Sequence, residues 1–344
     1  MSDEQAPACP RVIYLGGFGR SGSTLLERML GALPGWVNVG ELVDLPRSVQ
    51  PDDERCGCGE PFSRCPFWAE VGDRAFGGWD SATLSRLAEL RGLVARQRRV
   101  PGLLGLRAGR GGGSLRALVA EYQTQYGRIY RAVTEVSGAS TIVDASKGPA
   151  HGLALGIGGV PDRGYSLTMV NLVRDPRGVA YSWSRRKHER PQAGAGGREM
   201  WSIGAGRSAA QWAALQTEMD VIARTSGIPV ARVRYEDLVA TPRLTMAGLL
   251  RELGLTPAGL DHVGDHAVTL TASHGLSGNP GRFKHGTLDL VADDEWRREM
   301  AAGDRRLVTA ATFPWLRGYG YHRRPSSDLP SDPPSDPTTV RKPA

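Results

Sequence analysis

The first residues that could do chemistry form a glycine- and hydroxyl-rich loop. The loop, Gly17–Thr24 (GFGRSGST), separates a short apolar run, Arg11–Gly17, from Ser21–Leu33, which has leucines at helical spacing. Backbone amides in such a loop, together with the N-terminus of the following helix, favour a bound anion. The spacing is that of the magnesium-nucleotide loop GxxxxGK[ST], but Ser23 occupies the lysine position. We therefore predict an anion-binding loop and disfavour an ordinary ATPase or kinase; a glycine-rich turn without a ligand is the alternative.

A second group, far downstream, could bind a terminal phosphate. Arg174 follows the apolar run Ser166–Val173, and Ser182 lies about two helical turns later at ~3.6 residues per turn. Pro176 is suited to the first turn of the intervening helix. An arginine fork and a hydroxyl brought together in this way can bind phosphate oxygens. We predict a phosphate clamp here; a solvent-exposed arginine is the alternative.

Both segments resemble motifs of the sulfotransferase family. Residues 17–30 (GFGRSGSTLLERML) are similar to the family's 5′-phosphosulfate loop, and residues 170–182 are similar to its 3′-phosphate motif. The resemblance covers roughly residues 11–322. It implies 3′-phosphoadenosine 5′-phosphosulfate (PAPS) as the donor co-substrate, with no metal required. It also implies a set of donor-binding residues: Arg20, Ser21, Gly22, Ser23 and Thr24 for the phosphosulfate, and Arg174 and Ser182 for the 3′-phosphate.

Sulfuryl transfer to a hydroxyl needs a base for the acceptor proton and cations for the transferring and departing groups. Gly40-Glu41 resembles the tyrosylprotein sulfotransferase branch, in which the corresponding glutamate is the catalytic base, so Glu41 is the leading candidate. Residues 144–149 (DASKGP) resemble the Asp-Ser-Ser-Lys-x-Pro stretch of bacterial relatives, which implies that Lys147 stabilises the departing phosphate. Arg20 completes the predicted catalytic set, and Asp144 is a reserve base. Bracing of the loop by Glu41 and a surface position for Lys147 are the alternatives.

Two later segments carry weaker resemblances. Residues 234–238 (RYEDL) match the family's Tyr-Glu-Asp-Leu stretch, which implies that Tyr235 lies near the nucleotide. Residues 277–284 (SGNPGRFK) match the Gly-Asn-Pro-x-Arg segment of bacterial relatives, which implies a 3′-phosphate contact from Arg282. Charged surface loops would explain both segments. Cytosolic-type sulfotransferases use a histidine base, but we expect structural or exposed positions for the available histidines, His151, His274 and His285.

A cysteine-rich segment lies between these motifs. Cys56, Cys58 and Cys65 fall within ERCGCGEPFSRCPFW, residues 54–68. Three thiols this close could bind zinc with a fourth ligand from elsewhere, although the spacing contains no CxxC pair. We favour a structural loop on the substrate side and predict no metal. Four cysteines in 344 residues do not indicate a secreted disulfide framework.

The elements that must position these residues alternate between strand and helix. Strands are expected at residues 11–17, 36–45, 140–144, 166–173 and 229–235, and helices at 21–33, 83–99, 114–137, 147–156, 175–188, 208–226, 242–253 and 293–311. Residues 100–113 are expected to be a mobile connector and 188–206 a lid. Such alternation predicts a P-loop-type three-layer α/β/α fold with a central parallel sheet. We predict one domain over residues 11–322, a flexible segment at 1–10 and a disordered Pro/Ser/Asp-rich tail at 323–344.

The charge balance limits the classes of molecule that the protein is expected to bind. Lys and Arg number 43 against 36 Asp and Glu, a net charge of +7, which suits a polyanionic small ligand, nucleic acid or a membrane surface. No apolar run reaches the roughly 20 residues of a membrane span, and the N-terminus lacks the order of a signal peptide, so we expect a cytoplasmic protein. We expect a small-molecule or glycoconjugate hydroxyl acceptor and no nucleic acid, and leave a homo-oligomer open. A P-loop kinase or NTPase and a non-catalytic nucleotide or nucleic-acid binding module are the alternative functions.

Overall fold

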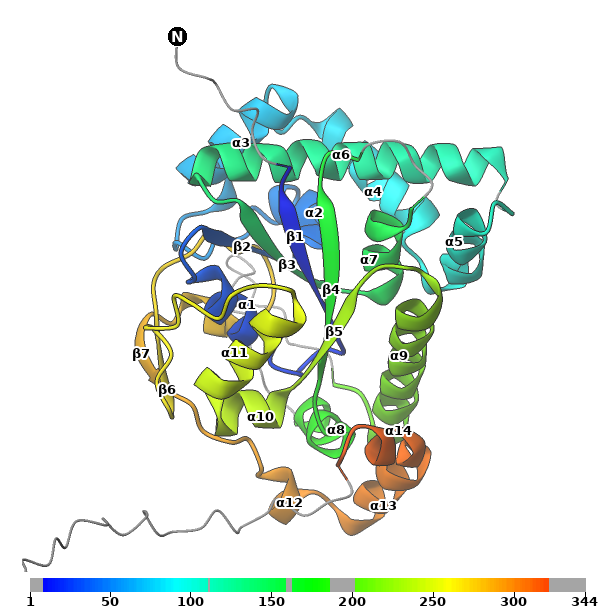
Figure 1. Cartoon of the computed structure of the whole chain (residues 1–344), viewed down its shortest axis with the longest axis vertical. Helices are drawn as coiled ribbons and strands as arrows, with labels where there is room; N and C mark the ends of the chain where they lie inside the picture. Colours follow the sequence, from blue (N-terminus) through cyan, green and yellow to red (C-terminus); the bar gives the residue numbers. More distant parts are fainter. Residues whose placement is uncertain (1–8, 111, 159–162, 186–201, 322–344) are drawn as a thin grey trace, which may run out of the picture.

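The computed structural model describes residues 9–110, 112–158, 163–185 and 202–321. Its centre is a five-stranded sheet in the order β2-β3-β1-β4-β5, in which every pairing is parallel. The strands are β1 (Arg11–Gly16), β2 (Trp36–Gly40), β3 (Thr141–Lys147), β4 (Ser166–Val173) and β5 (Val230–Arg234). Helices cover both faces (Figure 1), which confirms the predicted three-layer α/β/α fold. The predicted tail, residues 1–8 of the predicted flexible segment and residues 188–201 of the predicted lid lie outside the described residues.

The sheet is surrounded by helices of very different lengths. They are α1 (Ser23–Gly31), α2 (Leu45–Val49), α3 (Pro66–Phe76), α4 (Ser81–Val94), α5 (Val100–Arg107), α6 (Gly113–Ser137), α7 (Pro149–Gly156), α8 (Pro176–Ser184), α9 (Ala205–Thr225), α10 (Tyr235–Ala240), α11 (Pro242–Glu252), α12 (Trp296–Glu299), α13 (Ala302–Ala311) and α14 (Phe313–Gly318). In Figure 1, α10 and α11 lie to the left of β5 and α9 lies to its right. Sequence analysis missed the antiparallel hairpin of β6 (Ala267–Leu270) and β7 (Gly286–Asp289), because its strands are short and partly exposed.

The strand β1 shows how the sheet buries both of its faces. Val12 and Tyr14 join one hydrophobic cluster, to which α6 and α7 contribute. Ile13 and Leu15 point the other way, into a cluster with residues of α1 and α11. All four side chains are at most 1% exposed. A parallel strand that is covered on both faces requires a nearly continuous apolar run. Because β1 has such a run, the strand could be predicted from the sequence.

Two predictions about helices are wrong. Residues 100–113 include α5 and are not a simple connector; Val100, Leu103 and Leu106 form a buried stripe that outweighs the weak helix propensity of the glycines there. Residues 293–311 form α12 and α13 in place of one helix. The break falls at Met300, which is buried in an extended conformation.

The topology brings the predicted motifs to one edge of the sheet. The strands are parallel, so their carboxyl ends share that edge, and β1 lies between β3 and β4. The segments that follow these three strands, residues 17–24, 148–149 and 174–182, are therefore neighbours. In open α/β sheets, ligands bind outside the carboxyl ends, where the strand order changes direction.

Candidate active site

A pocket of about 550 Å³ opens at the carboxyl edge of the sheet. The residues that sequence analysis selected and that line it are Arg20, Gly22, Ser23, Thr24, Glu41, Lys147, Arg174, Ser182 and Tyr235. Further wall comes from the chain after β6, including Ser277, Gly278, Asn279, Gly281, Lys284 and Asp293. Segments that lie far apart in the sequence thus form one concave site, with cations and hydroxyls concentrated around the loop after β1.

The loop after β1 is shaped by close backbone packing. Gly22 precedes α1 with φ 90°, and a β-carbon there would lie 2.5 Å from the ring of Tyr235. A β-carbon at Gly17 would lie 2.6 Å from a carbonyl oxygen of β4. Only glycine tolerates such approaches. Ser23 and Thr24 begin α1 and line the pocket, so the positive end of the helix dipole is available to an anion there.

Arg20 joins the two predicted anion motifs. Its Nε donates a hydrogen bond to Ser182 Oγ at 3.1 Å. Its carbonyl oxygen accepts from an Nη of Arg174 at 2.8 Å. Burial, and then the charge of Arg174, lower the pKa of Arg20. Two guanidinium groups held this close and partly removed from water favour an anionic ligand, which would relieve their repulsion.

Arg174 is almost fully buried and is already paired. One Nη lies 2.8 Å from the carboxylate of Asp293 and 3.2 Å from its carbonyl oxygen. The guanidinium also lies over the ring of Tyr235, 4.6 Å from the centroid. The side chain of Asp293 is 39% exposed, against 7% for Arg174. A doubly charged ligand group at Arg174 would therefore compete with a carboxylate that can turn towards water.

Glu41 and Lys147 form a direct ion pair in the pocket wall. Glu41 follows β2, and Lys147 ends β3 with φ 66°. The amide of Glu41 donates to the carbonyl oxygen of Leu276 at 2.8 Å, which ties the base candidate to the chain after β6. The two side chains are 17% and 22% exposed, so both remain accessible from the pocket.

Asp144, the reserve base, lies behind the pocket and does not line it. It is fully buried and accepts hydrogen bonds from the hydroxyls of Tyr130, at 2.7 Å, and Ser146. Burial raises the pKa of Asp144 to about 6. The Ser146 oxygen in turn accepts from the amide of Val43 at 2.9 Å. This network connects the loop that carries Glu41 to the end of β3, where Lys147 lies.

Two predicted donor-binding residues do not line the pocket. Ser21 is buried, and its Oγ has no hydrogen-bond partner among the described residues. Arg282 is also buried, and its guanidinium donates to the carbonyl oxygens of Ser277 and Arg55. Arg282 therefore connects the pocket wall to the cysteine loop, an arrangement that does not fit the expected 3′-phosphate contact.

The three candidate histidines also lie outside the pocket lining. His151 is buried against the Tyr122 hydroxyl, 2.7 Å from its Nδ1, and burial lowers the pKa of His151 to about 3. His285 is exposed. His274 contacts Cys56 and Cys65. The structure thus places all three away from the position of a base in this pocket.

Sequence analysis missed several residues of the pocket. Arg28, on α1, donates at 2.9 Å to the carbonyl oxygens of Thr271 and Gly281 and so holds the later wall against the phosphate loop. Trp183 lines the pocket directly after Ser182. Arg28 lies within the recognised motif at residues 17–30 and Trp183 directly follows the other motif, so both could have been included. Lys284 ends the recognised segment at residues 277–284 but was given no role. Asp293 carries no local signal, because only the tertiary fold brings it to the site.

The chain is a three-layer α/β/α protein with a pocket after β1 that is lined by cationic and hydroxyl side chains. No protein-family model matches the chain, and no curated protein matches its sequence. Solved structures to which the chain is similar include the sulfotransferase domain of a Synechococcus olefin synthase, at 20% identity and a TM-score of 0.44, over 88% of this chain and 94% of that one. The sulfotransferase domain of the curacin biosynthetic pathway has 16% identity and a TM-score of 0.45, over 88% and 98%. A Mycobacterium tuberculosis sulfotransferase has 21% identity and a TM-score of 0.35, over 73% and 69%.

None of the helices in the described part of the chain combines the length and the apolar character that a membrane span needs.

Proposed function

We propose that the protein is a sulfotransferase that moves a sulfuryl group from PAPS to a hydroxyl acceptor. The observation that carries this proposal is the contact between the two anion motifs, in which Arg20 binds Ser182 and Arg174 binds the main chain of Arg20. Each motif resembles a donor-binding segment of sulfotransferases. In this chain they share one pocket with the ion pair of Glu41 and Lys147.

The donor would lie across the edge of the sheet. The phosphosulfate would be bound by the amides at the start of α1 and by Arg20, Ser23 and Thr24, where helix dipole and cations coincide. The 3′-phosphate would be bound by Arg174 and Ser182. Because Arg174 pairs with the partly exposed carboxylate of Asp293, the 3′-phosphate would replace that side chain as its partner.

The chemical step would be an in-line displacement at sulfur. Glu41 would accept the acceptor's hydroxyl proton while the acceptor oxygen forms its bond to sulfur. The bond between sulfur and the bridging phosphate oxygen would break, and 3′,5′-adenosine bisphosphate would leave with the electron pair. Lys147 and Arg20 would stabilise the charge on the departing phosphate and the transferring group. Binding of the donor would draw Lys147 towards the phosphosulfate and release Glu41 for the acceptor proton.

The proposal is tested by following the fate of the donor. Purified protein is incubated with PAPS and a panel of sugar, phenol, lipid and peptidyl-tyrosine acceptors, and 3′,5′-adenosine bisphosphate is quantified. We expect acceptor-dependent release of the bisphosphate and equal formation of a sulfated product. A parallel reaction contains ATP, magnesium and the same acceptors. Phosphorylated product from ATP, with PAPS left intact, would contradict the proposal and favour the kinase alternative.

A further inference from the structure

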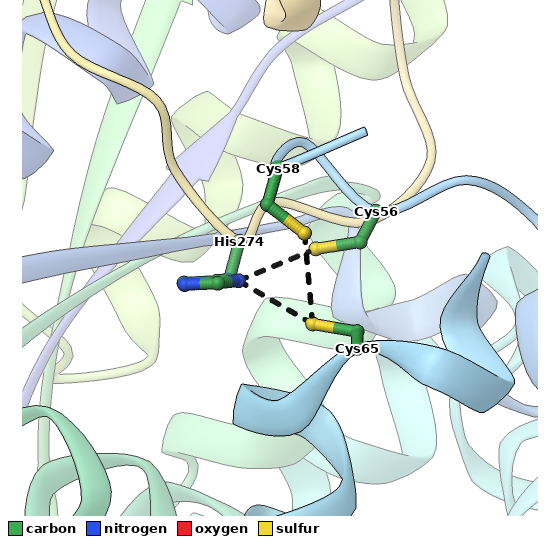
Figure 2. A group of neighbouring side chains, drawn as sticks. All are labelled: Cys56, Cys58, Cys65 and His274. Carbon is green, nitrogen blue, oxygen red and sulfur yellow. Dashed lines mark hydrogen bonds between the residues drawn. The ribbon is translucent and has the colours of Figure 1, made fainter. Parts of the chain in front are cut away.

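A second cluster of reactive side chains lies outside the pocket. Cys56, Cys58, Cys65 and His274 place their three sulfur atoms and one ring nitrogen within 4.8 Å of one another. Figure 2 shows the sulfurs and the ring nitrogen converging from the cysteine loop, the start of α3 and the chain after β6. Cys56 and Cys65 are fully buried. The fourth cysteine of the chain, Cys9, is exposed and is not part of the cluster.

Three of the six ligand-to-ligand distances in this cluster match those of a tetrahedral metal site, and all six are within 4.8 Å. Zinc binds thiolate sulfur at about 2.3 Å and imidazole nitrogen at about 2.0–2.1 Å, so tetrahedral ligands lie about 3.8 Å apart for two sulfurs and about 3.5 Å apart for sulfur and nitrogen. The sulfurs of Cys58 and Cys65 are 3.8 Å apart. Nδ1 of His274 is 3.6 Å from the Cys56 sulfur and 3.4 Å from the Cys65 sulfur. These three separations are those expected for ligands of a single tetrahedral ion.

We propose that Cys56, Cys58, Cys65 and His274 bind one structural zinc ion. Three thiolates and one imidazole are a closed ligand set for zinc, with no position left for water or substrate, so the ion has no part in sulfuryl transfer. Soft sulfur ligands exclude magnesium and calcium. The fourth ligand could not be predicted from the sequence, because His274 lies far downstream of the cysteine loop.

The surroundings of His274 hold it in place for this role. Its ring stacks on Phe67, with centroids 4.5 Å apart and planes 8° apart. Its carbonyl oxygen accepts from Nε1 of Trp68 at 2.8 Å. Gly57 donates to the carbonyl oxygen of Gly275 at 3.0 Å, and a β-carbon on Gly57 would lie 2.6 Å from a neighbouring carbonyl oxygen. The cysteine loop and the chain around His274 are therefore packed backbone to backbone, independently of any ion.

The zinc ion would fix one wall of the pocket. Leu276, two residues after His274, forms hydrogen bonds with the residues on both sides of Gly40, the last residue of β2. Its amide donates to the carbonyl oxygen of Val39 at 3.0 Å, and its carbonyl oxygen accepts from the amide of Glu41 at 2.8 Å. Ser277 and the residues after it line the pocket. By joining His274 to the cysteine loop, the ion would hold in place the segment at Leu276 and Ser277, to which the backbone of Glu41 is hydrogen-bonded.

The metal content of the full chain tests the proposal without reference to any activity. Protein is produced in zinc-supplemented medium, purified without chelators and examined by elemental mass spectrometry. We expect one zinc ion per chain in the wild type and in the matched control Cys9→Ser, and less than a tenth of that in Cys58→Ser. Wild-type protein without zinc, with stoichiometric iron, or with a Cys58–Cys65 disulfide would overturn the proposal, as would full zinc retention by Cys58→Ser.

A second measurement covers the case in which Cys58→Ser fails to fold. Wild-type protein grown with cobalt should show the visible absorption bands of tetrahedral, thiolate-bound Co²⁺; their absence from a cobalt-loaded protein would overturn the assigned geometry. Hydrogen exchange then tests the link to the pocket wall. Chelation of the metal should speed exchange of the Leu276 amide while amides of β1 stay protected. Unchanged exchange at Leu276 would overturn the role in holding the wall.

Discussion

The pocket and the cysteine–histidine cluster hold their polar side chains in two different ways. In the pocket, cations are kept in place by weak, replaceable partners, such as the exposed carboxylate of Asp293 beside Arg174. In the cluster, Cys56 and Cys65 are buried, and His274 is fixed by stacking on Phe67. The first arrangement suits a substrate that must enter and leave. The second suits an ion that stays, so the two regions should respond differently to substitution.

The largest expected effect is on turnover, at Glu41. Glu41→Gln keeps the shape of the side chain but removes its capacity to accept a proton, so kcat should fall roughly 10²- to 10⁴-fold, the usual contribution of general acid–base catalysis. Binding of 3′,5′-adenosine bisphosphate should change little. Steady-state kinetics with an active acceptor, together with calorimetry, measure both. Wild-type turnover in Glu41→Gln would remove Glu41 from the mechanism, and unchanged zinc content would show that the cluster is unaffected.

The next effect is on affinity, at Arg174. Arg174→Ala removes a buried, charge-assisted donor, and a loss of about 1.5–3 kcal/mol corresponds to roughly tenfold to hundredfold weaker binding of the bisphosphate. Arg177→Ala is the matched control, since Arg177 pairs with Asp175 on the same helix turn and does not line the pocket. Titration calorimetry on both variants is the measurement. Equal affinities for the two would contradict the phosphate clamp.

A pH effect is expected at Glu27, which lies between the two regions. Its Oε1 accepts from Asn38 at 2.8 Å, and the same Asn38 amide donates to Ser273, next to His274. Burial raises the pKa of Glu27 from 4.5 to about 7. The folded protein therefore binds this proton more tightly, so its stability falls as the pH rises from about 4.5 to about 7.

Glu27→Gln cannot titrate and should lose this pH dependence. Between about pH 4.5 and pH 7, the unfolding free energy of the wild type should fall by up to roughly 3 kcal/mol relative to that of the variant. Above about pH 7 the difference between the two proteins should stay constant. Denaturant unfolding at a series of pH values measures it. A difference that does not vary with pH would contradict the raised pKa of Glu27.

The smallest effect is expected at Asp293. Asp293→Asn removes the carboxylate that competes for Arg174. Because the Asp293 side chain is 39% exposed and water screens its charge, we expect the pair to contribute only about 1 kcal/mol, so affinity for the bisphosphate should rise by up to roughly fivefold. Asp289→Asn, on β7, is a control for the change in net charge. Weaker binding by Asp293→Asn would indicate that this residue helps the ligand.

The sequence predicted the features that are encoded locally. The buried strand β1 follows from an uninterrupted apolar run, β4 follows from a run that is apolar except for Thr168 and Asn171 after its first residue, and the loop at Gly17–Thr24 follows from glycine spacing. The meeting of Arg20 with Ser182 required the strand order, which places β1 beside β4. Three features arise only from the tertiary fold and were missed in the sequence. They are the pairing of Arg174 with Asp293, the burial of Arg282 outside the pocket lining, and the position of His274 beside the cysteines. Short apolar stripes such as that of α5 were missed because glycines obscured them.

The central claim is that the pocket selects a 3′-phosphate through Arg174 and Ser182. The most direct measurement is titration calorimetry of the wild-type protein with 3′,5′-adenosine bisphosphate and with 5′-AMP at the same ionic strength. The two ligands differ only in the 3′-phosphate, so the account predicts at least roughly tenfold tighter binding of the bisphosphate, since a charge-assisted contact contributes about 1.5–3 kcal/mol. Equal affinities for the two nucleotides would contradict it.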